Sequence, residues 1–118
     1  MMGRLSTHVL DTVRGLPAAG MRLTLSRREG EAWRSLGAFV TNAQGRTDTP
    51  LLEGAALLPG TYQLEFCVAD YFRAQGVALP QPPFLGLVPL CVGIADAAGH
   101  YHVPLLCSPW SYSTYRGS

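Results

Sequence analysis

The first segments of the chain alternate between apolar and polar residues. In residues 4–10, Leu5, Thr7 and Val9 occupy one set of alternate positions, and Arg4, Ser6, His8 and Leu10 occupy the other. Residues 21–26 alternate in the same way. Because successive side chains of a β-strand point to opposite faces, this period of two predicts strands with one buried face.

The rest of the chain continues this pattern between groups of turn-forming residues. We expect further strands at residues 33–41, 61–68, 84–95, 100–107 and 112–116, and turns at 11–20, 27–32, 42–49 and 96–99. In the strand at 61–68, the side chains expected to point inward are those of Tyr62, Leu64, Phe66 and Val68. One short helix is predicted over 69–75, ended by Gly76. The proline-rich residues 80–83 are expected to form a stiff loop.

These elements predict an all-β fold. Seven to eight short strands with one short helix are typical of a two-sheet β-sandwich. The length of 118 residues predicts one domain, residues 1–118, and the chain has no internal repeat or linker.

The composition of the chain limits the kinds of molecule that it is expected to bind. Apolar residues make up 47% of the chain and charged residues only 14%, a balance that favours a subunit partly covered by copies of itself. The net charge of +1 gives no electrostatic reason to expect binding to nucleic acid or to an anionic membrane. All nine basic residues are arginine, whose planar guanidinium suits flat, oxygen-rich ligands.

The cysteines and the chain ends suggest a compartment. Cys67, Cys91 and Cys107 are an odd number, and each lies in an apolar run, so we expect buried free thiols rather than disulfides. No signal peptide, spanning helix or peroxisomal address is expected from the sequence. The cytoplasm is therefore the expected location.

The three histidines are the first candidates for chemistry. His100 and His102 share one face of a predicted strand, an arrangement that serves acid–base chemistry or zinc binding, or is a plain pairing on a strand face. His8 lies inside the first strand on its more polar face, where it is either functional or simply a partly exposed histidine. The residues alone leave these alternatives open.

Arg46 is the fourth candidate, in a turn beside Gly45. It could bind a ligand, or it could pair with Asp48 and brace the loop. Ser108 and Ser113 lack the surroundings of an activated serine, and the chain has no phosphate-binding, dinucleotide-binding or Cys-x-x-Cys motif. The residues alone therefore predict a small β-sandwich with a few polar side chains that are candidates for chemistry, and they do not identify a substrate.

Three segments carry a resemblance to a known family. They are THVLD (Thr7–Asp11) with the following GLPAAG (Gly15–Gly20), TNAQGRTD (Thr41–Asp48), and HYHVPLLCSPWSYSTYRGS (His100–Ser118). Together they resemble the 5-hydroxyisourate hydrolases of the transthyretin-like family over essentially the whole chain. The terminal YRGS is the most specific part, because transthyretin itself shares the fold but lacks this tail.

The resemblance implies an assembly and a set of site residues. It implies a homotetramer, built as a dimer of dimers around a central channel, with active sites where subunits meet. It implies that His8, Arg46 and His102, with the tail Tyr115–Ser118 (Tyr115, Arg116 and Ser118 above all), form the active site. No metal or other cofactor is implied.

The implied reaction is hydrolysis of the N1–C6 amide of 5-hydroxyisourate to 2-oxo-4-hydroxy-4-carboxy-5-ureidoimidazoline. One histidine, His8 or His102, would accept a proton from the attacking water, and the other would position the water or protonate the leaving nitrogen. Arg46 would hold the substrate and stabilise the oxyanion. Tyr115 would close the pocket, and the carboxylate of Ser118 would orient a histidine or Arg116.

Two other functions remain as alternatives. A transthyretin-like carrier would hold a flat aromatic ligand in the channel without turning it over, and a structural sandwich of immunoglobulin type would need neither channel nor tetramer. The chain also departs from the family pattern at Trp110, Ser111 and the unusually apolar segment 84–95. These departures concern the channel and the packing of subunits rather than the expected chemistry.

Overall fold

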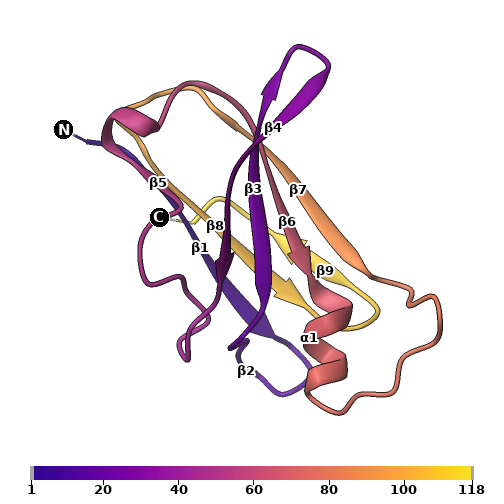
Figure 1. Cartoon of the computed structure of the whole chain (residues 1–118). Helices are drawn as coiled ribbons and strands as arrows, with labels where there is room; N and C mark the ends of the chain where they lie inside the picture. The colour runs from indigo at the N-terminus through magenta and orange to yellow at the C-terminus, as the bar shows by residue number, and fades with distance from the viewer. Residues whose placement is uncertain (1, 118) are drawn as a thin grey trace.

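The computed structural model describes residues 2–117 as two β-sheets packed face to face (Figure 1). The first sheet has the order β2-β1-β8-β9, with β5 also paired to β1, and the second has the order β4-β3-β6-β7. The strands are β1 (Arg4–Asp11), β2 (Leu16–Pro17), β3 (Arg22–Glu29), β4 (Ala32–Val40), β5 (Leu52–Glu53), β6 (Gly60–Cys67), β7 (Leu87–Ile94), β8 (His100–Cys107) and β9 (Tyr112–Thr114). The predicted β-sandwich is confirmed.

The first and last long strands of the chain lie side by side in the first sheet. β1 and β8 run parallel over their whole length, from Arg4 opposite His100 to Asp11 opposite Cys107. All other strand pairs are antiparallel. This pairing places residues almost one hundred positions apart on neighbouring strands, and it positions the candidate site.

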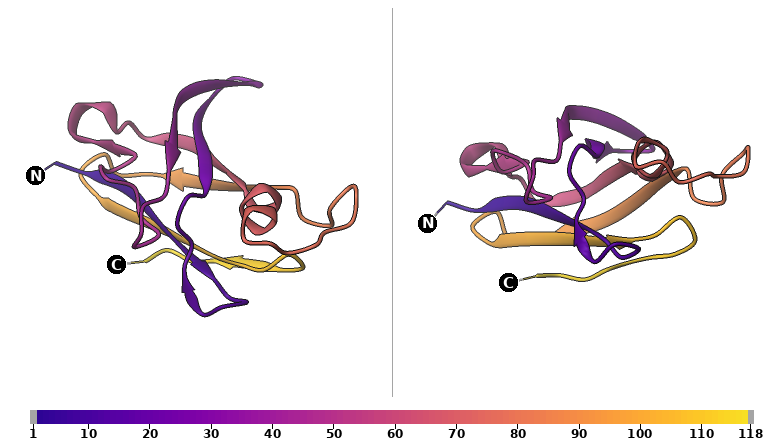
Figure 2. Two further views of the ribbon diagram at one scale, coloured as in Figure 1. Left: turned by 60° about the horizontal axis from the view of Figure 1, so that its bottom comes forward. Right: turned by 90° about the horizontal axis from the view of Figure 1, so that it is seen from below.

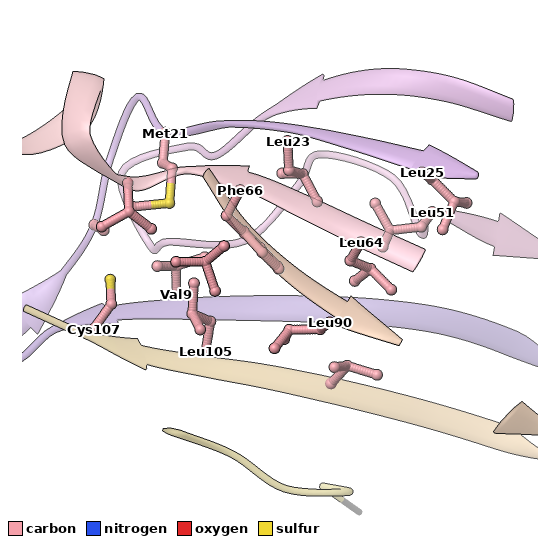
Figure 3. Packing of buried hydrophobic residues seen from close by; sticks show 14 of the residues in the cluster. Val9, Met21, Leu23, Leu25, Leu51, Leu64, Phe66, Leu90, Leu105 and Cys107 are labelled. Atoms are coloured by element: carbon pink, nitrogen blue, oxygen red, sulfur yellow. The ribbon is translucent and has the colours of Figure 1, made fainter. Parts of the chain in front are cut away.

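Side chains from both sheets fill the space between them (Figure 3). The alternation identified this core correctly in and next to β1, β3 and β6: the buried residues there are Leu5, Thr7, Val9, Met21 just before β3, Leu23, Leu25, Tyr62, Leu64, Phe66 and Val68 just after β6. The complementary side chains of β1 therefore point away from the core. The outer face of the first sheet is left to Arg4, Ser6, His8 and Leu10.

The hairpin of β3 and β4 is longer than predicted and projects beyond the sandwich (Figures 1 and 2). The expected turn at 27–32 was wrong, because β3 continues to Glu29 and β4 begins at Ala32. Arg28 lies over the ring of Trp33, and Arg34 pairs with Glu29. Neither face of this tip is buried, so the alternation that marks a half-buried strand is missing there.

Other differences concern short elements. β2 lies inside the segment expected to be a turn, and β5 is followed by a one-turn 3₁₀ helix, Gly54–Ala56, in a region with no assigned element. β7 begins at Leu87 rather than residue 84, and β9 ends at Thr114 rather than residue 116. Strands of two or three residues depend on the neighbouring strand and have no periodicity of their own.

The predicted helix is present as α1 (Val68–Ala74), and Gly76 follows it with a φ of 85°. The helix is joined to the end of β1 through buried Asp11. Oδ2 of Asp11 accepts hydrogen bonds from the Tyr71 hydroxyl at 2.8 Å and from Nε of Arg14 at 3.0 Å. This network fixes the end of the sandwich opposite to the first residues of β1.

All three cysteines are free, as expected, but their burial was only partly predicted. Cys107 is buried and burial raises the pKa of its thiol to about 12, whereas Cys67 is half-buried and Cys91 is exposed. Cys91 is exposed because it lies on the outer face of β7, although the strand around it is apolar. Within residues 2–117, no helix is long and apolar enough to cross a membrane.

Candidate active site

Two histidines from opposite ends of the chain meet on the outer face of the first sheet. His8 points outward from β1 and His102 from the neighbouring β8, with their ring centroids 6.5 Å apart. Ser6 lies directly opposite His102 in the strand register, and its Oγ is 2.9 Å from Nδ1 of His102. The parallel pairing of β1 and β8 therefore brings together a cluster of polar side chains that neither strand could form alone.

Arg46 reaches the same place from the loop after β4. Three segments share the edge of β1 that faces away from β8: β2 opposite Leu10 and Asp11, β5 opposite Arg4 and Leu5, and Arg46 in an isolated bridge opposite His8. The backbone N–H of Val9 donates to the carbonyl of Gly45 at 2.8 Å. These contacts place the start of the Arg46 side chain beside the histidine pair.

The loop that carries Arg46 is shaped by Asn42. Its Oδ1 accepts hydrogen bonds from the backbone N–H groups of Gln44 and Arg46, and its Nδ2 donates to Asp48 at 3.0 Å. The described residues show no ion pair between Arg46 and Asp48, so the alternative in which that pair braces the loop is wrong. Asn42 performs the bracing, and the Arg46 guanidinium remains available to the pocket.

The chain end returns along β8 to the histidine pair. After β9, Gly117 forms an isolated bridge with His102 and donates its N–H to the His102 carbonyl at 2.7 Å. A Cβ on Gly117 would lie 2.6 Å from Cδ2 of His102, so only glycine allows the backbone to pack this closely on the imidazole. The tail is therefore a wall of the site.

The tail residues predicted for the site differ in where they point. Tyr115 lines the pocket together with His8 and His102. Arg116 instead stacks on the ring of Tyr101, 4.3 Å from its centroid, and donates to the His100 carbonyl at 3.3 Å. Ser118 lies outside the described residues.

These groups surround a pocket of about 590 Å³. Its lining is mostly polar and consists of Arg4, Ser6, Thr7, His8, Arg46, Thr47, Asp48, Thr49, Pro50, His100, Tyr101, His102, Tyr115 and Gly117. This volume falls within the usual range for small-molecule sites. The pocket can therefore hold a small planar molecule against two imidazoles and a guanidinium.

Electrostatics favour the neutral form of His102. Burial lowers the pKa of its imidazole below the ordinary value of 6.5, and the positive charge of Arg46 and the neighbouring His8 lower it further. Since Nδ1 faces Ser6, Nε2 is the nitrogen without a hydrogen-bond partner among residues 2–117. A neutral imidazole with one free nitrogen can accept a proton at neutral pH.

His100 lies on the same strand face as His102, as predicted, and lines the same pocket, but its ring contacts a different segment. Its Nε2 lies 3.3 Å from the carbonyl oxygen of Met2. The aromatic partner of His102 is His8 on the neighbouring strand. Among the described residues, no group of three or more His, Cys, Asp or Glu side chains is arranged to hold a metal ion.

Comparison with known proteins agrees with this architecture. Residues 5–117 match the family model described as the HIUase/Transthyretin family. The chain belongs to this family. A 5-hydroxyisourate hydrolase of Rhizobium meliloti is 60% identical over 116 residues, which cover 98% of this chain and 97% of that protein.

The solved structures similar to this chain include a 5-hydroxyisourate hydrolase and transthyretins. The chain resembles Klebsiella pneumoniae 5-hydroxyisourate hydrolase with a TM-score of 0.81 and 36% identity, over 98% of this chain and 99% of that one. It resembles sea bream transthyretin in complex with thyroxine with a TM-score of 0.85 and 30% identity, over 97% and 94% of the two chains. A structure of (S)-allantoin synthase matches 99% of this chain with a TM-score of 0.93 and 46% identity, but this chain spans only 44% of its length.

Two residues of the candidate site, Ser6 and Asn42, were missed by the sequence analysis, and a third, Gly117, was expected there only as part of the tail. Ser6 contacts His102, Gly117 packs on the same ring, and Asn42 shapes the loop of Arg46. Ser6 could have been found, because it lies two positions before His8 and therefore on the same strand face. Asn42 could also have been found, because an Asn side chain that accepts from the backbone N–H two residues later is a local turn pattern. The packing of Gly117 on His102 joins the tail to β8, and no local pattern reveals that contact.

Proposed function

We propose that this protein is a 5-hydroxyisourate hydrolase that cleaves the N1–C6 amide of its substrate. The single observation that carries the proposal is the arrangement of His8, Arg46 and His102 around one pocket, with the tail as its wall. The 60% identity to a 5-hydroxyisourate hydrolase over nearly the full length of both chains supports the same substrate.

His102 is the proposed general base. Burial and the charge of Arg46 hold the pKa of its imidazole below the ordinary value, so its neutral form predominates at neutral pH. Nε2 accepts a proton as the water oxygen attacks the C6 carbonyl carbon. The carbonyl electrons then move onto oxygen, and a tetrahedral oxyanion forms.

Arg46 and His8 complete the proposed reaction. The Arg46 guanidinium binds the flat, oxygen-rich substrate and stabilises the oxyanion. When the intermediate collapses, the C6–N1 bond breaks, its electron pair goes to N1, and a proton delivered by His8 or returned by His102 neutralises that nitrogen. The products are the ring-opened carboxylate form of 2-oxo-4-hydroxy-4-carboxy-5-ureidoimidazoline and a released proton, which balances the added water.

The tail closes this site in our proposal. Tyr115 covers one side of the pocket and hydrogen-bonds the substrate edge. Arg116 supports the wall from behind through its stacking on Tyr101 rather than by binding substrate through its guanidinium. Ser118, which lies outside the described residues, is proposed to orient a histidine or Arg116. The scheme calls on no cofactor.

We further propose a homotetramer, a dimer of dimers located in the cytoplasm, in which residues 1–118 act as one domain. Two strands, β7 and β9, form open edges of the two sheets. Large apolar side chains are exposed where these strands begin: Phe84, Leu87, Trp110 and Tyr112. Association of copies would cover both the edges and these side chains.

The carrier function is the second candidate, because the fold also matches transthyretin with thyroxine bound. The ligand site of a carrier could be lined by many different sets of apolar side chains. The pocket here is instead polar and surrounds two histidines and an arginine, which a carrier does not need. The enzyme therefore accounts for more of the structure.

A direct assay separates the two functions. 5-Hydroxyisourate is generated from urate with urate oxidase, and its decay is followed by ultraviolet absorbance with wild-type protein and with His102→Ala. We expect wild-type protein to accelerate the decay and His102→Ala to lose on the order of 10²-fold in kcat/KM. A decay rate unchanged by wild-type protein would contradict the enzymatic function.

A further inference from the structure

Ser6 and the candidate base, His102, both line the pocket and contact each other there. Oγ of Ser6 is 2.9 Å from Nδ1 of His102, and the two residues are direct neighbours in the register of β1 and β8. Both side chains are partly buried, so this contact is only partly exposed to water. The geometry therefore couples the hydroxyl to one particular nitrogen of the ring.

A hydroxyl can serve either tautomer of a histidine, but only one suits a base. If Nδ1 carries the proton, it donates to Oγ of Ser6, and Nε2 has a free electron pair facing the pocket. This hydrogen bond persists when Nε2 takes up a second proton, because Nδ1 still donates. In the other tautomer, the Ser6 hydroxyl would donate to Nδ1 and would have to turn around when the ring is protonated.

We propose that Ser6 is a positioning residue that holds His102 with its proton on Nδ1, so that Nε2 is the proton acceptor in the pocket. This inference rests on the proposed hydrolase function for its catalytic meaning. The contact between Ser6 and His102, and its effect on the tautomer, can be measured without activity.

The choice of a hydroxyl rather than a carboxylate has a further consequence. A carboxylate at Nδ1 would stabilise the imidazolium form and raise the pKa of His102. Ser6 is uncharged and orients the ring without this effect. The charged or titratable side chains that share the pocket with His102 are Arg4 and His8 from β1, His100 and Tyr101 from β8, Arg46 and Asp48 from the loop, and Tyr115 from the tail.

Three substitutions test the proposal. Ser6→Ala removes the hydroxyl, Ser6→Thr keeps it, and Ser6→Asp replaces it with a carboxylate. Ser113→Ala, on exposed β9, is the matched control for removing a strand serine. For each variant, ¹⁵N chemical shifts of His102 report the tautomer, an NMR titration reports the pKa of the ring, and steady-state kinetics report kcat and KM.

We expect the ¹⁵N shifts of wild-type His102 to show a protonated Nδ1 and a free Nε2. In Ser6→Ala they should move toward a mixture of tautomers, with kcat reduced by roughly 10-fold to 100-fold and KM changed much less. Ser6→Thr should restore both shifts and kcat, and Ser6→Asp should move the acid limb of the pH profile to higher pH. Ser113→Ala should behave as wild type.

Two results would overturn the proposal. One is a wild-type His102 that carries its proton on Nε2. The other is a Ser6→Ala variant with unchanged His102 shifts, even if its activity falls, because the loss would then come from packing. If wild-type protein has no hydrolase activity, the proposed function fails, while the NMR result still decides whether Ser6 sets the tautomer.

Discussion

At the residue scale, the two imidazoles of the candidate site differ because their surroundings differ. His102 is tied to Ser6 at Nδ1 and packed against the backbone of Gly117, and burial lowers its pKa. His8 lies beside the backbone of Arg46 at the edge of the sheet. From the sequence either histidine could be the base, and it is these contacts between distant segments that favour His102.

The charge of Arg46 should influence the titration of His102. Arg46→Ala removes a positive charge that opposes protonation of the ring, so we expect the pKa of His102 to rise toward its ordinary value of 6.5. Arg46→Lys keeps the charge and should leave the pKa nearly unchanged. An NMR titration of the His102 ring measures both, and equal values for wild type and Arg46→Ala would show that the charge is not felt.

The same shift predicts a pH profile. If neutral His102 is the base, kcat/KM should stay constant down to below pH 6.5 and then fall as the ring is protonated. In Arg46→Ala the residual activity should begin to fall at a higher pH than in the wild type. A profile that falls well above pH 6.5 in the wild type would argue against His102 as the titrating group.

A substitution at Gly117 tests how closely the tail must pack on His102 for activity. In Gly117→Ala the new Cβ would lie 2.6 Å from Cδ2 of His102, so the tail or the ring must move. We expect kcat/KM to fall by about 10-fold or more, while the thermal unfolding temperature changes little. Gly37→Ala is the control, since its Cβ would meet only the Phe39 ring at 3.4 Å. Full activity in Gly117→Ala would remove the tail backbone from the site.

At the scale of elements, the period of two predicted the faces of the long strands. It placed Leu5 and Val9 inside and His8 outside, and it grouped His100 with His102, all of which the structure confirms. It could not predict that β1 lies beside β8, because that pairing joins segments separated by most of the chain. It also missed β2 and β5, which form only where β1 offers them an edge.

The network around Asp11 predicts a pH-dependent contribution to stability. Burial alone would raise the pKa of Asp11, but hydrogen bonds from Tyr71, Arg14 and the backbone outweigh it and hold the pKa below 3.8. The carboxylate therefore stabilises the fold above pH 3.8, and this contribution is lost as the pH falls through the lower folded-state value. Asp11→Asn should lower the free energy of unfolding by about 1–3 kcal/mol at pH 7.

Urea unfolding at pH 7, 5 and 3 measures this contribution. The difference between wild type and Asp11→Asn should be largest at pH 7 and should shrink at pH 3. Asp70→Asn is the control, because its exposed carboxylate is 3.9 Å from Arg73 and contributes little. A difference that is the same at all three pH values would mean that the charge of Asp11 does not act through this network.

At the scale of the whole molecule, the open edges and exposed apolar side chains favour assembly. The rings of Phe84 and Trp110 lie 6.2 Å apart on the surface, and both are more than half exposed. We expect light scattering to give the mass of four chains. Trp110→Asp should shift the mass to smaller species, whereas Trp33→Asp, on the projecting hairpin, should not.

The measured masses can contradict both the tetramer and the position of its interface. A monomeric mass for the wild type would contradict the tetramer, and a Trp110→Asp variant that remains tetrameric would place the interface elsewhere. The side chains of Trp110 and Trp33 are both exposed and lie outside the hydrophobic core. A changed mass in either variant therefore reflects association rather than unfolding.

The outer face of β1 and β8 is the proposed active site. A crystal structure with urate bound tests this assignment most directly, because urate is a stable molecule with the purine skeleton from which the substrate is made. We predict that its ring lies in the pocket of about 590 Å³ between Arg46 and His102, with Nε2 of His102 facing a ring carbonyl. Urate bound away from His8, Arg46 and His102 would contradict the assignment of this face as the active site.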